Sequence, residues 1–293
     1  MTTTQLLVST IRWQRPNLRK ASLALFVYAI LIFIVALSLY PFVMMVINSF
    51  KSDTEIVINP SAFPRVWTLN SYGSLLTQNN GLWVNFINSV IIAVTSTMLA
   101  VVMTSMAAFA FSKFRFRGRD LMFTVLMLTL MVPSQITIPP LFLLFSKLGW
   151  LNTLQIQIVP TLTSVFGLFL IRQYMLGVPD EMLEAARIDG ATQWQVFWRI
   201  MMPVSAPILG AFAILHFLGV WNAYLWPLLV ANDSHVQPIM VTLPNLTDPN
   251  LGFLPVWGTI MAGCVLATLP ILVVFVAFQN RFMASVVVGA IKE

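Results

Sequence analysis

Six apolar runs, each long enough to cross a lipid bilayer, dominate this sequence. A bilayer core of about 30 Å requires roughly 20 apolar residues in a helix. Only 9% of the residues are charged, whereas a soluble domain carries roughly 25%. The sequence therefore predicts an all-α, polytopic membrane protein. Its six predicted membrane-spanning helices are Ser22–Ile47, Phe86–Phe111, Leu121–Phe145, Leu154–Met175, Val204–Val230 and Trp257–Phe278.

The Lys and Arg residues are distributed unevenly between the segments that connect the predicted spans. With six spans, both tails and two of the connecting loops share one side, and that side carries thirteen of the sixteen Lys and Arg residues. Only Lys51, Arg65 and Lys147 fall on the other side. The positive-inside rule therefore predicts cytoplasmic termini. It also explains the net charge of +6 by topology and contact with anionic lipids, so that no nucleic-acid surface is required.

These assignments predict how the chain is organised along its length. The first apolar run follows a basic segment but is much longer than the apolar core of a signal peptide, so we expect it to be retained. The predicted parts are an N-terminal cytoplasmic tail (1–21), the first span (22–47), an extracytoplasmic loop (48–85), a five-helix core (86–280) with a cytoplasmic loop at about 176–203, and a C-terminal cytoplasmic tail (281–293).

The search for catalytic and metal-binding motifs is largely negative. No G-x-x-x-x-G-K-[ST] phosphate loop occurs, so nothing in the sequence predicts that the chain binds ATP by itself. The only histidines are His216 and His235, too few for an all-histidine metal site. His216 lies within the fifth predicted span, where it serves either transport or a hydrogen bond to a neighbouring helix. The single cysteine, Cys264, excludes an intrachain disulfide.

The six predicted spans contain no Asp, Glu, Lys or Arg. Proton-driven carriers usually relay protons through carboxylates or histidines inside the membrane. We therefore expect energy to enter from outside the bilayer. A cation-coupled secondary carrier remains an alternative, because hydroxyls and carbonyls can bind sodium. A membrane-embedded enzyme is weakly supported, since no catalytic pair or metal constellation appears.

Two polar stretches lie within the predicted spans. In "MVPSQITIPPLF" (131–142), Pro133, Pro139 and Pro140 require a kinked or broken helix, which is tolerated only inside protein or beside a water-filled cavity. Near the end of the fifth span, "WNAYLWPLLV" (221–230) combines polar and aromatic residues, typical of either an interfacial belt or stacking on sugar rings. The candidate pathway-lining residues are Gln135, Thr137, Asn222 and Tyr224.

The longest stretch of mixed charge, "EAARIDGATQWQVFWRIMMP" (184–203), lies between the fourth and fifth spans. Pro179 and Asp180 predict the start of a helix, and Gly190 predicts its end. Thr192 with Gln195 predicts a capping box for a second helix that continues to Met201, and Pro203 is expected to stop that helix and open the fifth span. The predicted helix–glycine–helix elbow (184–203) suits either docking to a cytoplasmic partner, through the charges of Glu184 and Arg187, or an interfacial amphipathic helix.

The elbow resembles the signature loop of the permeases of ATP-binding-cassette importers, E-A-A-x-x-x-G-x(9)-I-x-L-P. Glu184, Ala185, Ala186, Gly190, Ile200 and Pro203 stand in register, and Met202 replaces the usual leucine. The resemblance covers nearly the whole chain and is closest in type to the carbohydrate-uptake branch, that of the second maltose permease. Further segments similar to that branch are "WTLNSY" (67–72), "FAFSKFRFRGRD" (109–120), "KLGWLNT" (147–153), "WGTIMAGCVLATLP" (257–270) and "GAIK" (289–292).

The resemblance implies a type I importer permease fold and a division of labour among several chains. It implies a second, related permease beside this one in the inner membrane. It also implies two cytoplasmic ATPases that bind ATP and Mg, and an extracytoplasmic sugar-binding protein. The elbow is then the coupling helix that seats in a cleft of one ATPase. This chain is expected to be no enzyme and to bind no cofactor, and the sequence does not identify the sugar.

Overall fold

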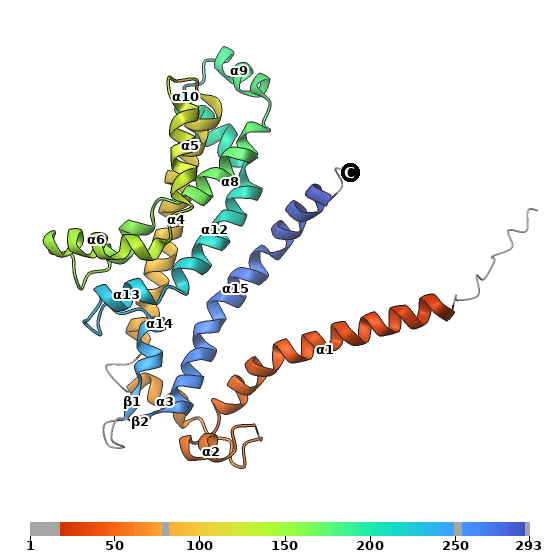
Figure 1. Ribbon diagram of the computed structural model, residues 1–293, viewed down its shortest axis with the longest axis vertical. Helices are drawn as coiled ribbons and strands as arrows, with labels where there is room; N and C mark the ends of the chain where they lie inside the picture. The colour runs from red at the N-terminus through yellow and green to blue at the C-terminus, as the bar shows by residue number, and fades with distance from the viewer. Residues whose placement is uncertain (1–17, 62, 78–81, 249–253, 291–293) are drawn as a thin grey trace, which may run out of the picture.

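The computed structural model describes residues 18–61, 63–77, 82–248 and 254–290, and within them the chain is almost entirely helical (Figure 1). The described strands, β1 and β2, have two residues each and pair antiparallel. The elements, in order, are α1 (Leu18–Asn48), α2 (Asp53–Ile58), α3 (Asn70–Thr77), α4 (Trp83–Lys113), α5 (Arg119–Thr129), α6 (Ser134–Lys147), α7 (Gln155–Ile158), the 3-10 helix η2 (Val159–Thr161), α8 (Val165–Leu176), α9 (Asp180–Ile188), α10 (Gln193–Val196), the π-helical turn η3 (Phe197–Met201), α11 (Met202–Val204), α12 (Ala206–Trp221), α13 (Leu225–Val230), α14 (Ile239–Thr242), the 3-10 helix η4 (Leu243–Asn245), β1 (Thr247–Asp248), β2 (Leu254–Pro255) and α15 (Trp257–Ala290).

Three described helices are long and apolar enough to cross a membrane without a break, namely α1, α4 and α15. They correspond to the first, second and sixth predicted spans, although α15 continues as a helix past Phe278 to Ala290. Three further apolar segments are bent pairs of helices. Counting each bent pair as one span makes six, in agreement with the predicted all-α, six-span fold. Most of the predicted N-terminal tail, up to residue 17, and residues 291–293 lie outside the described residues.

The third predicted span is broken, as its prolines required. Helices α5 and α6 meet at an angle of 98°, and Pro133 stands immediately before the first residue of α6. Pro139 and Pro140 lie inside α6 rather than at the break. Because proline has no backbone N–H, these two residues leave the carbonyls of Gln135 and Ile136 without their helical hydrogen bonds.

The fourth span, which we expected as one helix over Leu154–Met175, is also bent. A 41° bend separates α7 and η2 from α8. Pro160 lies in η2, and Ser164 begins α8 by accepting a hydrogen bond from the N–H of Gly167 at 3.0 Å. The side-chain oxygen of Ser164 thereby satisfies one of the free N–H groups at the start of the new helix. In the sequence, the signal for this break is Ser164, a residue of a helix-capping type inside an apolar run, and the prediction overlooks it.

The fifth span differs from the prediction at both ends. Pro203 is next to the last residue of a continuous helical run, Gln193–Val204, so this run ends one residue beyond the predicted stop. The chain bends by 78° one residue after α11, at Ser205. At the far end, residues 222–224 separate α12 from α13, so that Val204–Val230 is not a single helix.

Helix α4 is central to the bundle because small residues cover its buried face. Ser89, Ala93, Ser96, Ala100 and Ala108 recur at intervals of three, four or eight residues, and all are at most 3% exposed. Such small residues allow helices to approach closely where lipid supplies no hydrophobic driving force. Helices α8 and α12 both pack against α4 and also contact each other (Figure 1). Helix α4 therefore connects the two ends of the bundle.

The two ends of the bundle carry different structures (Figure 1). One end holds α9, α10 and the connection between α4 and α5. The opposite end holds α2, α3, β1 and β2, and α1 extends away from the bundle beside them. At that end, the Asp53 carboxylate accepts a hydrogen bond from the N–H of Gly258 at 2.7 Å, which joins α2 to the start of α15. The elbow thus lies at the end opposite to this α2–α15 contact.

Candidate functional site

The elbow has the local structure that its sequence predicts. Helix α9 begins at Asp180 and ends at Ile188, followed by Gly190 with φ +84°. The N–H of Gly190 donates to the Arg187 carbonyl at 3.0 Å, and the N–H of Ala191 donates to the Ala186 carbonyl at 2.9 Å. These two bonds form a Schellman motif, in which a left-handed residue satisfies the last carbonyls of a helix. Glycine adopts that left-handed conformation without steric cost.

The predicted capping box begins the second half of the elbow. The Gln195 N–H donates to the Thr192 hydroxyl at 3.3 Å, and the Thr192 N–H donates to the Gln195 side-chain oxygen at 2.8 Å. Both bonds satisfy backbone donors that the start of α10 would otherwise leave free. Only two residues separate the Schellman glycine from Gln193, the first residue of α10. The elbow is therefore stabilised by hydrogen bonds within its own segment.

Helix α9 presents one side chain inward and several outward. Leu183 is 2% exposed and packs into a cluster of buried residues with Phe197 and Met201. Ile188, by contrast, is 86% exposed, although it is apolar. Glu184 is also exposed. The end of α9 therefore presents an apolar side chain to solvent beside charged groups.

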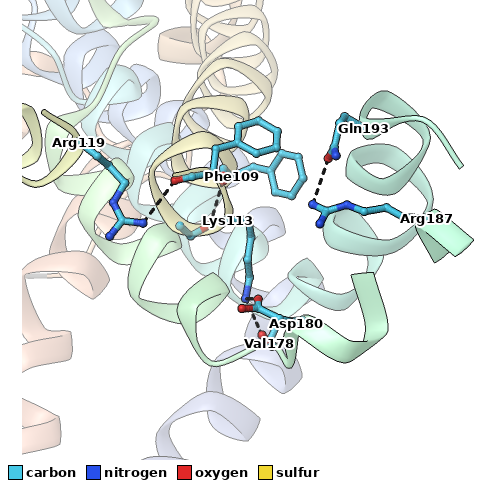
Figure 2. A network of polar contacts seen from close by, with 9 residues as sticks. Phe109, Lys113, Arg119, Val178, Asp180, Arg187 and Gln193 are labelled. Atoms are coloured by element: carbon cyan, nitrogen blue, oxygen red, sulfur yellow. Dashed lines mark hydrogen bonds and ion pairs between the residues drawn. The ribbon is translucent and has the colours of Figure 1, made fainter. Parts of the chain in front are cut away.

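The six signature positions divide between this surface and the core beneath it. Glu184, Ala185, Gly190 and Pro203 are exposed, whereas Ala186 and Ile200 are half-buried and pack against the core cluster around Leu183. Ala185 is therefore open to contact from outside, whereas Ala186 packs against its own chain. Arg187, at the outer face, donates from Nη2 to the Gln193 side-chain oxygen at 3.4 Å, across the elbow (Figure 2).

Sequence reasoning missed the residue that ties the elbow to the bundle. Lys113, the last residue of α4, donates from Nζ to the Val178 carbonyl and to the Asp180 carboxylate, each at 2.6 Å (Figure 2). The lysine side chain is only 4% exposed. The hydrogen bond from Lys113, together with its positive charge, holds the pKa of the Asp180 carboxyl below its ordinary value. No local pattern indicates this contact, because its partners are 67 positions apart.

Aromatic rings connect the second half of the elbow to the same end of α4. The ring of Phe197 lies 5.6 Å from that of Phe109 on α4, between centroids. Phe197 also contacts Trp194 and Trp198 at centroid distances of 5.9 and 5.0 Å. Offset aromatic pairs at such distances add to the energy of the area they bury. Both halves of the elbow are thereby attached to α4, one by the Lys113 contacts and the other by this aromatic cluster.

The candidate pathway residues lie far from the elbow, around a cavity of about 360 Å³. Gln135, Thr137 and Tyr224 line this cavity, whereas Asn222 does not. Asn222 instead donates from Nδ2 to the Leu218 carbonyl at 2.9 Å, within its own helical turn. The structure therefore brings three of the four candidates together from two separate spans.

His216 joins three of the broken or central helices. Its Nε2 lies 2.8 Å from the Thr161 carbonyl, and its Nδ1 lies 3.3 Å from the Thr97 hydroxyl. Because a carbonyl only accepts, Nε2 carries the proton and Nδ1 accepts from the hydroxyl. The histidine thus satisfies a carbonyl freed where η2 ends, which agrees with the interpretation of His216 as a hydrogen-bonded partner of neighbouring helices. Within the described ranges, no group of three His, Cys, Asp or Glu residues could hold a metal ion.

The described structure is an apolar helical bundle with broken spans, a cavity between them and an elbow at one end. The chain belongs to the family of binding-protein-dependent transport system inner membrane components, whose model matches residues 100–287. This range includes the elbow and most of the cavity. The resemblance to importer permeases is thereby confirmed, as is the prediction that the chain is a multi-pass membrane permease and not an enzyme.

Relatives across the family extend over nearly the whole chain. The arabinooligosaccharides transport system permease protein AraQ of Halalkalibacterium halodurans is 34% identical over 263 residues, which are 89% of this chain and 93% of the relative. The lactose transport system permease protein LacG of Rhizobium radiobacter is 33% identical over 98% of this chain and 100% of the relative. The sn-glycerol-3-phosphate transport system permease protein UgpE of Salmonella typhi is 29% identical over 92% of this chain and 97% of the relative.

Solved structures share the fold. A chain in the crystal structure of a bacterial ABC transporter involved in the import of the acidic polysaccharide alginate aligns with a TM-score of 0.79 and 23% identity. The alignment covers 90% of this chain and 98% of that chain. A second match, at a TM-score of 0.60 and 14% identity, is a chain of the alginate transporter in complex with a pentasaccharide-bound periplasmic protein. The fold is thus that of an ABC importer permease.

Proposed function

We propose that this chain is a permease subunit of an ATP-driven importer of mono- or oligosaccharides, coupled to its ATPase through the elbow. It pairs with a second permease, two ATPases bind and hydrolyse ATP with Mg at the cytoplasmic face, and an extracytoplasmic binding protein delivers the sugar. The observation that carries the proposal is the exposed outer face of α9, with Glu184 and Ile188, on an elbow that is rigid from within. A rigid, outward-facing helix is what a soluble partner requires in order to exert force on a membrane protein.

The contacts beneath the elbow provide two routes for that force. Displacement of α9 is resisted by the Lys113–Asp180 ion pair at 2.6 Å, so that a pull on α9 is transmitted to α4. Displacement of α10 is transmitted through η3 and α11 to the bend at Ser205 and then to α12. Helices α4 and α12 both contribute residues to the 360 Å³ cavity. Closure of the ATPases could therefore change the exposure of that cavity from one side of the membrane to the other.

The assignment of a carbohydrate substrate rests on the relatives. Two permeases that are at least 33% identical to this chain, and align with most of it, carry names that specify arabinooligosaccharides and lactose. The presence of aromatic residues in the cavity wall supports the same class, because aromatic faces stack on the apolar faces of sugar rings. No observation favours the cation-coupled carrier, and the experiments below distinguish it from the importer.

The orientation is part of the proposal, with both termini and the elbow in the cytoplasm. It is supported by the thirteen-to-three distribution of Lys and Arg and by the position of the basic Arg115 segment beside the elbow. Single cysteines, placed in a Cys264→Ser background, test it with an impermeant maleimide. Arg115→Cys is expected to react only from the cytoplasmic side and Arg65→Cys only from outside. Labelling of both from one side would contradict the orientation.

Docking at the elbow is tested with Ile188→Asp and Glu184→Lys in the complete transporter. Both changes place an unfavourable group on the exposed face of α9 without disturbing Leu183 beneath it. We expect each variant to insert normally, to lose co-purification of the ATPase, and to lose ATP-driven sugar uptake in proteoliposomes. The matched control is Ile58→Asp, which replaces a 73% exposed isoleucine on α2, at the opposite end of the bundle.

Two outcomes would contradict the proposal. If Ile188→Asp retains the ATPase and transports sugar as well as Ile58→Asp does, the elbow is not the docking surface. If the chain reconstituted alone accumulates sugar under a proton or sodium gradient, it is a cation-coupled carrier. An uptake that requires ATP together with the ATPase subunits supports the importer.

A further inference from the structure

Breaks in three membrane spans meet at one cavity. Ser134, the first described helical residue after the α5–α6 break, lines it, as do Pro160 and Thr161 at the end of η2. The break between α12 and α13 contributes Ala223 and Tyr224. Irregular backbone at membrane depth is tolerated only where it is buried in protein or borders a polar cavity. In many secondary transporters, a different class of membrane protein, solute sites are built from such discontinuous helices.

The cavity wall combines apolar surface with neutral polar groups. Gln135 and Tyr224 line the cavity, and their side chains form no hydrogen bond with any other described residue. Gln157, also in the wall, is 2% exposed and donates from Nε2 to the Val236 carbonyl at 3.0 Å. Its Oε1 oxygen has no hydrogen-bond partner among the described residues. Because this oxygen is itself buried, the polar groups available to a ligand in the cavity are those of Gln135 and Tyr224.

None of the residues that line the cavity carries a charge, and the indole of Trp226 adds an aromatic surface. An ionised phosphate or carboxylate transferred into such a site would lose its hydration without gaining a counter-charge. A neutral molecule with many hydroxyl groups would instead pair with the amides and the phenol, while its C–H faces contact the aromatic rings. A volume of about 360 Å³ falls within the range of small-molecule sites.

We propose that this cavity is a binding subsite for a neutral sugar, contributed by this chain itself along the transport pathway. The inference rests on the proposed function. It goes further by naming the residues that contact the solute and by stating that the solute is uncharged. Gln135 and Tyr224 supply hydrogen bonds to sugar hydroxyls, and Trp226 supplies a stacking surface.

The test uses the complete transporter, with its partner permease, ATPases and sugar-loaded binding protein, in proteoliposomes. The probes are lactose and arabinotriose as neutral sugars and glucuronate as an anionic one. Tyr224→Phe and Gln135→Leu each remove a hydrogen-bonding group from an exposed position, so that folding is preserved. Each is expected to lower uptake of the transported neutral sugar by up to about tenfold at limiting concentration, as the loss of about 1.4 kcal/mol would do. Co-purification of the ATPase should remain normal.

The matched control is Tyr40→Phe, which makes the same chemical change on the exposed surface of α1 and should leave uptake unchanged. If Tyr224→Phe and Gln135→Leu take up the neutral sugar as fast as an active wild type does, the subsite is refuted, whereas the proposed function is not. Wild-type uptake of glucuronate at the rate of the neutral sugars refutes its neutrality. If the wild-type transporter shows no ATP-driven uptake of any of these probes, the proposed carbohydrate function fails, and the subsite fails with it.

Discussion

The replacement Gly190→Val tests whether coupling depends on the backbone geometry of the elbow. Gly190 has φ +84°, and an added Cβ would meet no atom within 4 Å. The effect of valine is therefore conformational strain alone, without a steric clash. A β-branched residue held at positive φ is a genuine outlier.

The magnitude follows from that strain. A non-glycine residue in the left-handed region costs about 1–3 kcal/mol, and 1.4 kcal/mol corresponds to about a tenfold change in an equilibrium. The docking-competent elbow should therefore become roughly 5- to 150-fold less populated relative to alternatives in which the Schellman bonds of Gly190 and Ala191 are broken. The same strain is small beside the burial of six spans, so that insertion into the membrane should remain normal.

The assay measures co-purification of the ATPase and ATP-driven sugar uptake from the same preparations. Gly190→Asn should retain most of both activities, because asparagine tolerates the left-handed region better than other residues. The matched control is Gly149→Val, since Gly149 also has a positive φ, of +69°, and also has no atom within 4 Å of an added Cβ, but follows α6, away from the elbow. Wild-type behaviour of Gly190→Val in both measurements, or an equal loss in Gly149→Val, would refute the reasoning.

Two further predictions concern contacts inside the bundle. Because the pKa of Asp180 is depressed by Lys113, the ion pair is fully present above the ordinary carboxyl pKa and is lost only as the pH falls through the lowered value. The rate of proteolysis of the elbow in the wild type should therefore stay the same between about pH 8 and about pH 5. In Asp180→Asn the rate should be higher at every pH in that range. A wild type that becomes sensitive to proteolysis within that range would contradict this prediction. Gly167→Ala should lower the thermal stability of the detergent-solubilised protein, because a Cβ there would overlap the ring of Phe212, whereas Gly219→Ala, with no atom within 4 Å, should not; equal melting temperatures would contradict the packing argument.

Much of the elbow could be predicted from the sequence because its structure is determined by neighbours. The Schellman bonds of Gly190 and the capping box of Thr192 connect residues three to five positions apart, so the identities of a few residues determine them. The break at Pro133 was predictable for the same reason, since a missing N–H acts locally. The number and approximate limits of the spans followed from the lengths of the apolar runs.

Tertiary structure decided everything that depends on which distant residues meet. The bond between Lys113 and Asp180 joins the end of one helix to the start of another, and neither local sequence indicates its partner. The sequence predicts a break at Pro203, two residues before the bend at Ser205, but the angle of 78° between the two helices is set by their packing. The approach of Gln135 to Tyr224 around one cavity depends on the angles at which broken spans pack. The sequence by itself determined local helix starts, stops and apolar lengths, because these depend on backbone hydrogen bonds within a few residues. Packing between helices determined the Lys113 contact and the cavity, because helix packing angles and distances arise only when whole surfaces meet.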